Sequence, residues 1–152
     1  MRRRFLALVA AVALAAPASA QQGPAAVTGI ARLALPEAPQ RSADADQETL
    51  ALQLAETLGV ACRGHEMWRW AFPEDDFPRA QGIVGAGERA FRARGYAVAL
   101  LPVEIDVVTA MRARLAGPPG APAPAGADAD VLALWYVGER GVDLTLCRVK
   151  EG

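Results

Sequence analysis

The clearest hydrophobic pattern in this 152-residue chain lies near its end. Two runs rich in β-branched and aromatic residues, 131–137 (VLALWYV) and 142–149 (VDLTLCRV), flank the four residues from Gly138 to Gly141. Such runs favour extended strands, and a short glycine-bounded connection favours a tight reversal between them. The pattern therefore predicts a C-terminal β-hairpin.

A second alternating pattern covers residues 65–72. In an extended strand, Glu66, Trp68, Trp70 and Phe72 fall on one side and the residues between them on the other. Helix-covered sheets usually bury their aromatic side chains, which favours a place for this stripe in the core. If the stripe is exposed, it forms a flat platform for a sugar ring or an apolar partner.

Residues 44–58 follow a helical pattern, with a leucine at every fourth position. Asp44 is suited to cap the first turn, and Gln47 three residues later resembles the second half of a capping box. Gly59 is well placed to end the helix. The segment therefore predicts a helix with one apolar face.

Two further helices are predicted at 81–94 and 106–116, separated by an interior strand at 96–101. Ala90 and Phe91 supply the apolar face of the first helix, although three glycines weaken it. The apolar face of the second helix consists of Val107, Val108, Met111 and Leu115. The turn around Pro73 and Pro78 precedes both helices.

These elements predict an α+β fold. We expect a two-layer sandwich in which a small, mainly antiparallel sheet, ending in the C-terminal hairpin, is covered by two or three helices. The predicted single domain spans residues 44–150. Residues 117–127 (GPPGAPAPAGA) predict an extended surface loop within it, because too little chain follows for a second core.

The N-terminus has the layout of an export signal. Three arginines precede the apolar run 5–15, and Ala18-Ser19-Ala20 supplies small residues for cleavage. We expect residues 1–20 to be removed and residues 21–43, rich in Ala, Pro and Gly, to form a flexible leader. The signal predicts a periplasmic or secreted protein. The twin-arginine route is an alternative to the ordinary secretory route, because Arg2-Arg3-Arg4-Phe5-Leu6 fits its pattern of two arginines, any residue, then Phe-Leu.

The charge of the exported chain argues against two classes of partner. The signal holds three of the sixteen basic residues and no acidic one, which leaves thirteen against seventeen, a formal charge of −4. No basic cluster remains to bind nucleic acid or an anionic membrane surface. No later apolar run is long enough to span a membrane, which needs roughly 20 residues.

Cys62 and Cys147 are the two cysteines of the chain. Since the bacterial envelope and exterior are oxidising, we expect them to form a disulfide. Closing a loop of this length is worth about 4.5 kcal/mol in the chain-entropy model. No C-x-x-C motif supports a redox role.

Two chemical sites are conceivable. Glu66 with Asp75 or Asp76 would act as an acid–base pair of a small hydrolase if two carboxyl groups lay about 5–10 Å apart. His65 and Glu66, together with the cysteines, would hold a metal ion. A solvated acidic turn at 74–76 and an oxidised cysteine pair are the simpler interpretations. No cofactor-binding motif is present, so no cofactor is expected.

The sequence thus favours a non-enzymatic accessory or binding protein of the cell envelope, with an unidentified protein or small molecule as its partner. The contact surface predicted for it is the stripe of Trp68, Trp70 and Phe72 together with the acidic turn at 74–76. The acid–base hydrolase and the metal-handling protein are the two alternatives.

Overall fold

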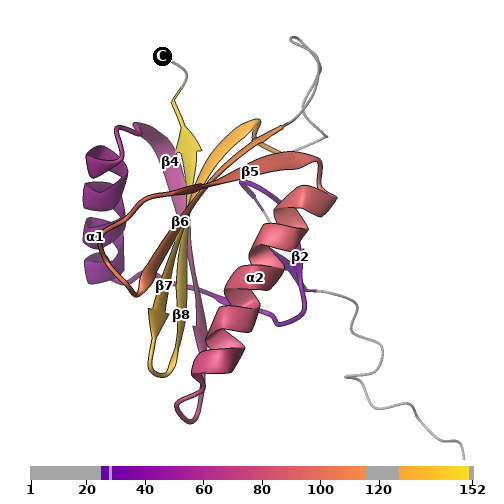
Figure 1. Cartoon of the computed structure of the whole chain (residues 1–152), viewed down its shortest axis with the longest axis vertical. Helices are drawn as coiled ribbons and strands as arrows, with labels where there is room; N and C mark the ends of the chain where they lie inside the picture. Colours follow the sequence, from indigo (N-terminus) through magenta and orange to yellow (C-terminus); the bar gives the residue numbers. More distant parts are fainter. Residues whose placement is uncertain (1–24, 28, 116–126, 151–152) are drawn as a thin grey trace, which may run out of the picture.

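The computed structural model describes residues 25–27, 29–115 and 127–150 (Figure 1). Eight strands and two helices make up this part of the chain. In chain order they are β1 (Ala25–Val27), β2 (Leu33–Leu35), β3 (Gln40–Arg41), α1 (Ala45–Thr57), β4 (Cys62–Ala71), α2 (Phe77–Ala93), β5 (Tyr96–Leu101), β6 (Val108–Leu115), β7 (Asp130–Gly138) and β8 (Gly141–Val149). The structure confirms the α+β class.

The main sheet has six strands in the order β3-β4-β8-β7-β6-β5. Every neighbouring pair is antiparallel. The two runs predicted to form a hairpin are β7 and β8, which pair from Val131 opposite Arg148 to Gly138 opposite Gly141. They occupy the centre of the sheet together with β4. A separate small hairpin joins β1 to β2.

The two helices lie on opposite faces of this sheet (Figure 1). Helix α2 and the β1–β2 hairpin cover one face, where Trp70, Phe91 and Trp135 are among the buried residues. Helix α1 covers part of the other face, over Leu132, Leu134 and neighbouring residues. Apolar side chains therefore pack on both faces, whereas the sequence pattern had suggested helices over one.

The prediction of a third helix at 106–116 is wrong, because this segment is strand β6. Four of its residues are buried, namely Val108, Ala110, Met111 and Ala113. Met111 and Ala113 pack in the core on the α2 side of the sheet, and Ala110 packs in the core on the α1 side. A strand that is buried on both faces shows no simple alternation, so its apolar positions also matched a helical spacing.

The described part of the segment 21–43, predicted as a flexible leader, is packed against the domain. Val27, Ile30 and Leu33 are fully or almost fully buried in the core with Trp70. A turn with positive φ at Gly29 and Arg32 reverses the chain between β1 and β2. The small apolar residues of this stretch cover sheet surface that α2 leaves open. The predicted signal peptide and residues 117–126 of the predicted loop lie outside the described residues.

Helix α2 begins at Phe77, earlier than the sequence predicted. The carboxylate of Asp76 accepts a hydrogen bond from the backbone N–H of Arg79 at 3.1 Å and caps the first turn. Pro78 lies in that turn, where a backbone N–H has no partner within the helix in any case. The second proline therefore starts the helix instead of excluding it.

A cleft between helix α1 and the sheet

Helix α1 is held at its start by Asp44, as the sequence predicted. Asp44 Oδ1 accepts hydrogen bonds from the backbone N–H groups of Asp46 at 2.9 Å and Gln47 at 3.1 Å. The Gln47 side chain does not complete a capping box. Its Nε2 donates to the backbone carbonyl of Leu144 at 3.2 Å, and its Oε1 accepts from Ser42 Oγ at 2.7 Å. Gln47 thus attaches the first turn of the helix to β8.

The helix approaches the sheet through small side chains. Ala51 and Ala55 are buried against it, whereas Leu50 and Leu54 are only half-buried. Between the helix and the sheet lies a cleft of about 250 Å³. Its lining residues are Asp44, Asp46, Gln47, Leu50, Ala51 and Leu54 from the helix side and Arg69, Val108, Leu134, Trp135, Tyr136, Asp143 and Thr145 from the sheet.

Charged groups gather at one end of this cleft. Arg69 donates through Nε to Asp143 Oδ1 at 2.6 Å and through a terminal nitrogen to Asp44 Oδ2 at 3.1 Å. Arg69 and Asp143 face each other because β4 and β8 pair in that register. Asp46 adds a third carboxylate. Three acidic groups and one guanidinium therefore leave this end of the cleft negative.

The pKa values of the two shared groups agree with this arrangement. The backbone hydrogen bond from Gln47, followed by the hydrogen bond from Arg69, lowers the pKa of Asp44 below its ordinary value. Hydrogen bonds to Asp143 and then Asp44 raise the pKa of Arg69. Both groups therefore stay ionised at neutral pH, and Arg69 is held in place by two carboxylates.

Thr145 is the one buried polar side chain among the residues that the structure describes, and it lies on the floor of the cleft. Its Oγ1 is 3.4 Å from Gln47 Nε2, a long hydrogen bond to an amide. An amide cannot take the proton of a hydroxyl, so this contact does not activate Thr145 as a nucleophile. The cleft offers walls and fixed charges suited to binding.

The aromatic stripe predicted as a contact surface is part of the core. Trp68, Trp70 and Phe72 are 8%, 3% and 6% exposed. Trp70 stacks on Trp135 with ring centroids 5.9 Å apart, and its Nε1 donates to the carbonyl of Glu37 at 3.0 Å. These three side chains therefore do not form the exposed platform that the sequence allowed for, and a binding role for them stays a prediction. The β1–β2 hairpin and α2 cover the face that the stripe occupies.

The structure does not assemble the predicted carboxylate pair. Glu66 lies within β4, where Oε2 accepts from the backbone N–H of Ile30 at 3.3 Å. Asp75 lies beyond the end of that strand and faces Arg140, while Asp76 caps α2. The five residues from Glu66 to the strand end span about 16 Å at ~3.3 Å per residue, too far for concerted acid–base action.

The predicted metal ligands are also separated. His65 and Glu66 are adjacent in β4 and therefore point to opposite faces of the sheet. His65 Nε2 lies 3.8 Å from Glu48 of α1, whereas Glu66 contacts the β1–β2 hairpin. Within the described ranges, no three His, Cys, Asp or Glu side chains are grouped so that they could hold a metal ion.

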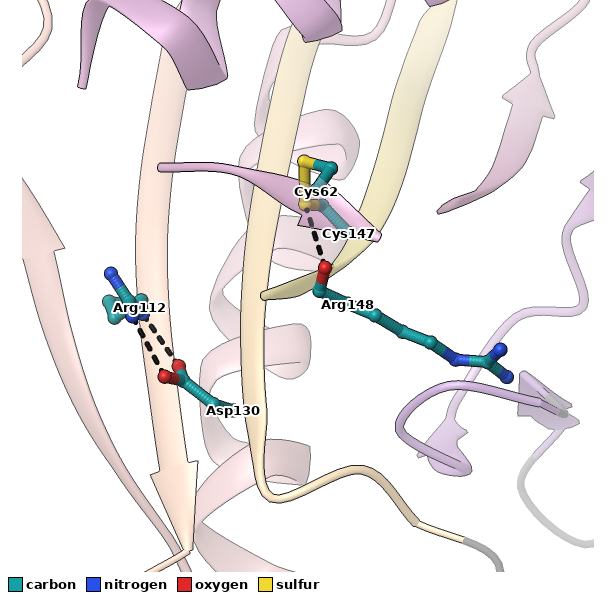
Figure 2. Close-up of a disulfide and its surroundings, with 5 residues drawn as sticks. All are labelled: Cys62, Arg112, Asp130, Cys147 and Arg148. Carbon is teal, nitrogen blue, oxygen red and sulfur yellow. Dashed lines mark hydrogen bonds and ion pairs between the residues drawn. A yellow bond between two sulfur atoms is a disulfide. The ribbon is translucent and has the colours of Figure 1, made fainter. Parts of the chain in front are cut away.

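The predicted disulfide between Cys62 and Cys147 is present, with Cα atoms 5.5 Å apart (Figure 2). It joins the start of β4 to β8 on the α1 face, and Cys147 is buried there. Figure 2 also shows the two hydrogen bonds between Arg112 of β6 and Asp130 of β7, at 2.6 and 2.8 Å. Both links hold neighbouring strands together on this face of the sheet.

Sequence reasoning missed the cleft because its parts come from distant segments. The one local signal was the half-apolar stripe of α1, where Leu50 and Leu54 recur at helical spacing. That Arg69 meets Asp143 depends on strand register, which the pattern of residues does not specify.

Within the part of the chain that the structure describes, no helix is both long and apolar enough to cross a bilayer. Comparison with protein-family models, with curated proteins and with solved structures finds no match to this chain.

Proposed function

We propose that this chain is an exported, non-enzymatic binding protein of the cell envelope, and that it holds a small ligand in the cleft between α1 and the sheet. The cleft itself carries this proposal, because it joins apolar walls to a fixed group of charges. The N-terminal signal pattern and the disulfide support export.

The lining indicates the chemistry of the ligand. Leu50, Leu54 and Leu134 offer an apolar surface, while Asp46 and the Asp44–Arg69–Asp143 group make one end negative. A ligand with an apolar body and a single positive charge matches both parts. The volume of about 250 Å³ is below the ~300–1,000 Å³ common for drug-sized molecules, so the ligand is small.

A matched set of probes tests this proposal. Hexylammonium, hexanol and hexanoate share one apolar chain and differ in charge. In a titration of the exported protein followed by NMR, we expect saturable shifts at Leu50 and Thr145 with hexylammonium. Hexanoate should bind roughly tenfold more weakly or worse, which is a difference of about 1.4 kcal/mol. Equal binding of the three probes, or no saturable shift with any, contradicts the proposal.

Substitutions at the cleft, with one matched control, test whether the probes bind there. Leu50→Trp fills the cleft and should abolish the shifts. Leu52→Trp is the matched control, because Leu52 lies on the same helix, is 39% exposed and does not line the cleft. Asp46→Asn should weaken hexylammonium and leave hexanol unchanged. If the two tryptophan variants bind alike, the ligand does not occupy this cleft.

A further inference from the structure

The two edges of the main sheet are protected differently. On one side, the short strand β3 pairs with Arg69 and Trp68 of β4, and the backbone N–H of Ser42 continues this pairing to Met67 at 2.9 Å. On the other side, β5 is the last strand. No strand within the described residues pairs with the outer edge of β5.

The hydrogen bonds of β6 show which backbone groups of β5 point outward. Leu115 of β6 donates its N–H to the carbonyl of Ala129, on the β7 side. Its partner in register is Tyr96, whose N–H and C=O must then point away from β6. By the alternation of antiparallel strands, Val98 and Leu100 also point their backbone groups outward. One of these groups, the Val98 carbonyl, accepts a hydrogen bond from the exposed Arg92 side chain at 3.3 Å.

The side chains of β5 do not protect this edge. Natural proteins discourage pairing at an edge with charges, prolines or bulges. The strand sequence YAVALL contains no charge and no proline, and its pairing with β6 is regular along all six residues. Leu100 is 62% exposed, the highest value among the large apolar residues that the structure describes. The edge is therefore suited to accept another strand.

We propose that β5 is a homodimer interface, at which two copies of this chain pair their β5 strands antiparallel about a two-fold axis. An axis at Val98 places Tyr96 opposite Leu100 of the second copy, so that outward-pointing residues face each other. The two sheets then become continuous, and the exposed Leu100 side chain packs beside Tyr96 of the other copy.

Charge complementarity selects a second copy as the occupant. Arg92 and Arg94 precede the strand, while Glu104 and Asp106 follow it. An antiparallel two-fold pair brings the basic end of each strand to the acidic end of the other.

The test measures association and locates it at the same time. A single pair of edge strands buries little surface, so we expect a weak dimer that forms across a series from about 10 µM to 1 mM in sedimentation equilibrium. Over the same range, hydrogen exchange of the Val98 and Leu100 amides should slow. The Ala97 and Ala99 amides point toward β6 and should not change. A monomer throughout, or exchange independent of concentration, overturns the proposal.

Variants give the independent check. Leu100→Lys should weaken the dimer roughly tenfold or more, because a lysine on an edge strand opposes pairing. Leu52→Lys, on exposed helix surface, is the matched control and should leave the dimer unchanged. Glu104→Arg should weaken it, and the double variant Arg92→Glu/Glu104→Arg should restore it, because the axis at Val98 places residue 104 of one copy opposite residue 92 of the other. If the dimer forms equally well in wild type and Leu100→Lys, association occurs elsewhere and the proposal is wrong. Neither result affects the cleft, which lies at α1.

Discussion

Gly87 of α2 lies directly against the indole ring of Trp135. A Cβ atom placed on Gly87 would be 2.2 Å from Cζ2 of Trp135, a separation that no real contact reaches. Trp135 is completely buried at the centre of the sheet and stacks on Trp70. The absence of a side chain at Gly87 thus allows the helix to lie close to the largest residue of the core.

Substitution at this position should therefore destabilise the protein. We expect Gly87→Ala to lower the free energy of unfolding by about 1–3 kcal/mol, because the ring of Trp135 must move within a packed core. Gly82→Ala is the control, since a Cβ there meets nothing within 4 Å. In the Gly82→Ala variant, the higher helix propensity of alanine over glycine should raise the free energy of unfolding by up to about 1 kcal/mol. Urea unfolding measures both, and changes of the same sign in the two variants would contradict this explanation.

Gly29 should be sensitive for two reasons. Its φ is +106°, and a Cβ there would lie 1.7 Å from Oε1 of Glu66. Gly59 separates the two effects, because its φ is +72° but no atom lies within 4 Å of its Cβ position. We expect Gly59→Ala to cost about 1 kcal/mol, from backbone conformation alone, and Gly29→Ala to cost more. Adding Glu66→Ala to Gly29→Ala should recover part of the loss in thermal unfolding; purely additive costs would show that Glu66 is not the obstacle.

Loss of the disulfide should be the most damaging covalent change. Cys62 and Cys147 close a loop with a sequence separation of 85 residues. Removal should lower the free energy of unfolding by up to about 4.5 kcal/mol on the chain-entropy estimate. The measurement is urea unfolding of the disulfide-bonded wild type and of the double variant Cys62→Ser/Cys147→Ser, with and without reductant. Reductant should shift the wild-type midpoint toward that of the variant and leave the variant unchanged. An unchanged wild-type midpoint after verified reduction would contradict the prediction.

Acid should weaken the link between β6 and β7. The hydrogen bond from Arg112 is the first cause that lowers the pKa of Asp130 in the folded state. A carboxyl group with a lowered folded pKa contributes stability above its unfolded pKa of about 3.9, and that contribution is lost as the pH falls through the folded value. Asp130→Asn should therefore be less stable than wild type at pH 7, with the difference shrinking below about pH 4. Urea unfolding at both pH values measures this, and a difference that persists at low pH would assign the loss to packing.

The sequence patterns that worked are those in which neighbouring residues decide the outcome. The β7–β8 runs, the capped start of α1 and the cysteine pair were all predictable, because strand propensity and capping act locally and the disulfide involves two residues alone. The patterns that failed needed knowledge of distant partners. Strand β6 matched a helical spacing because both of its faces are buried. The burial of Val27, Ile30, Leu33 and Leu35 was not predicted, because distant segments build the face of the sheet that these residues cover.

By itself, the order of residues determined the α+β class, the C-terminal pair of strands and the identity of the disulfide. Only the tertiary structure decided which side chains meet across strands, such as Arg69 with Asp143, and which edge strand is left without a partner strand among the described residues. The physical reason is that register and strand order arise from packing between segments far apart in the chain. A two-residue period specifies the face on which a side chain lies, but not the residue that it meets there.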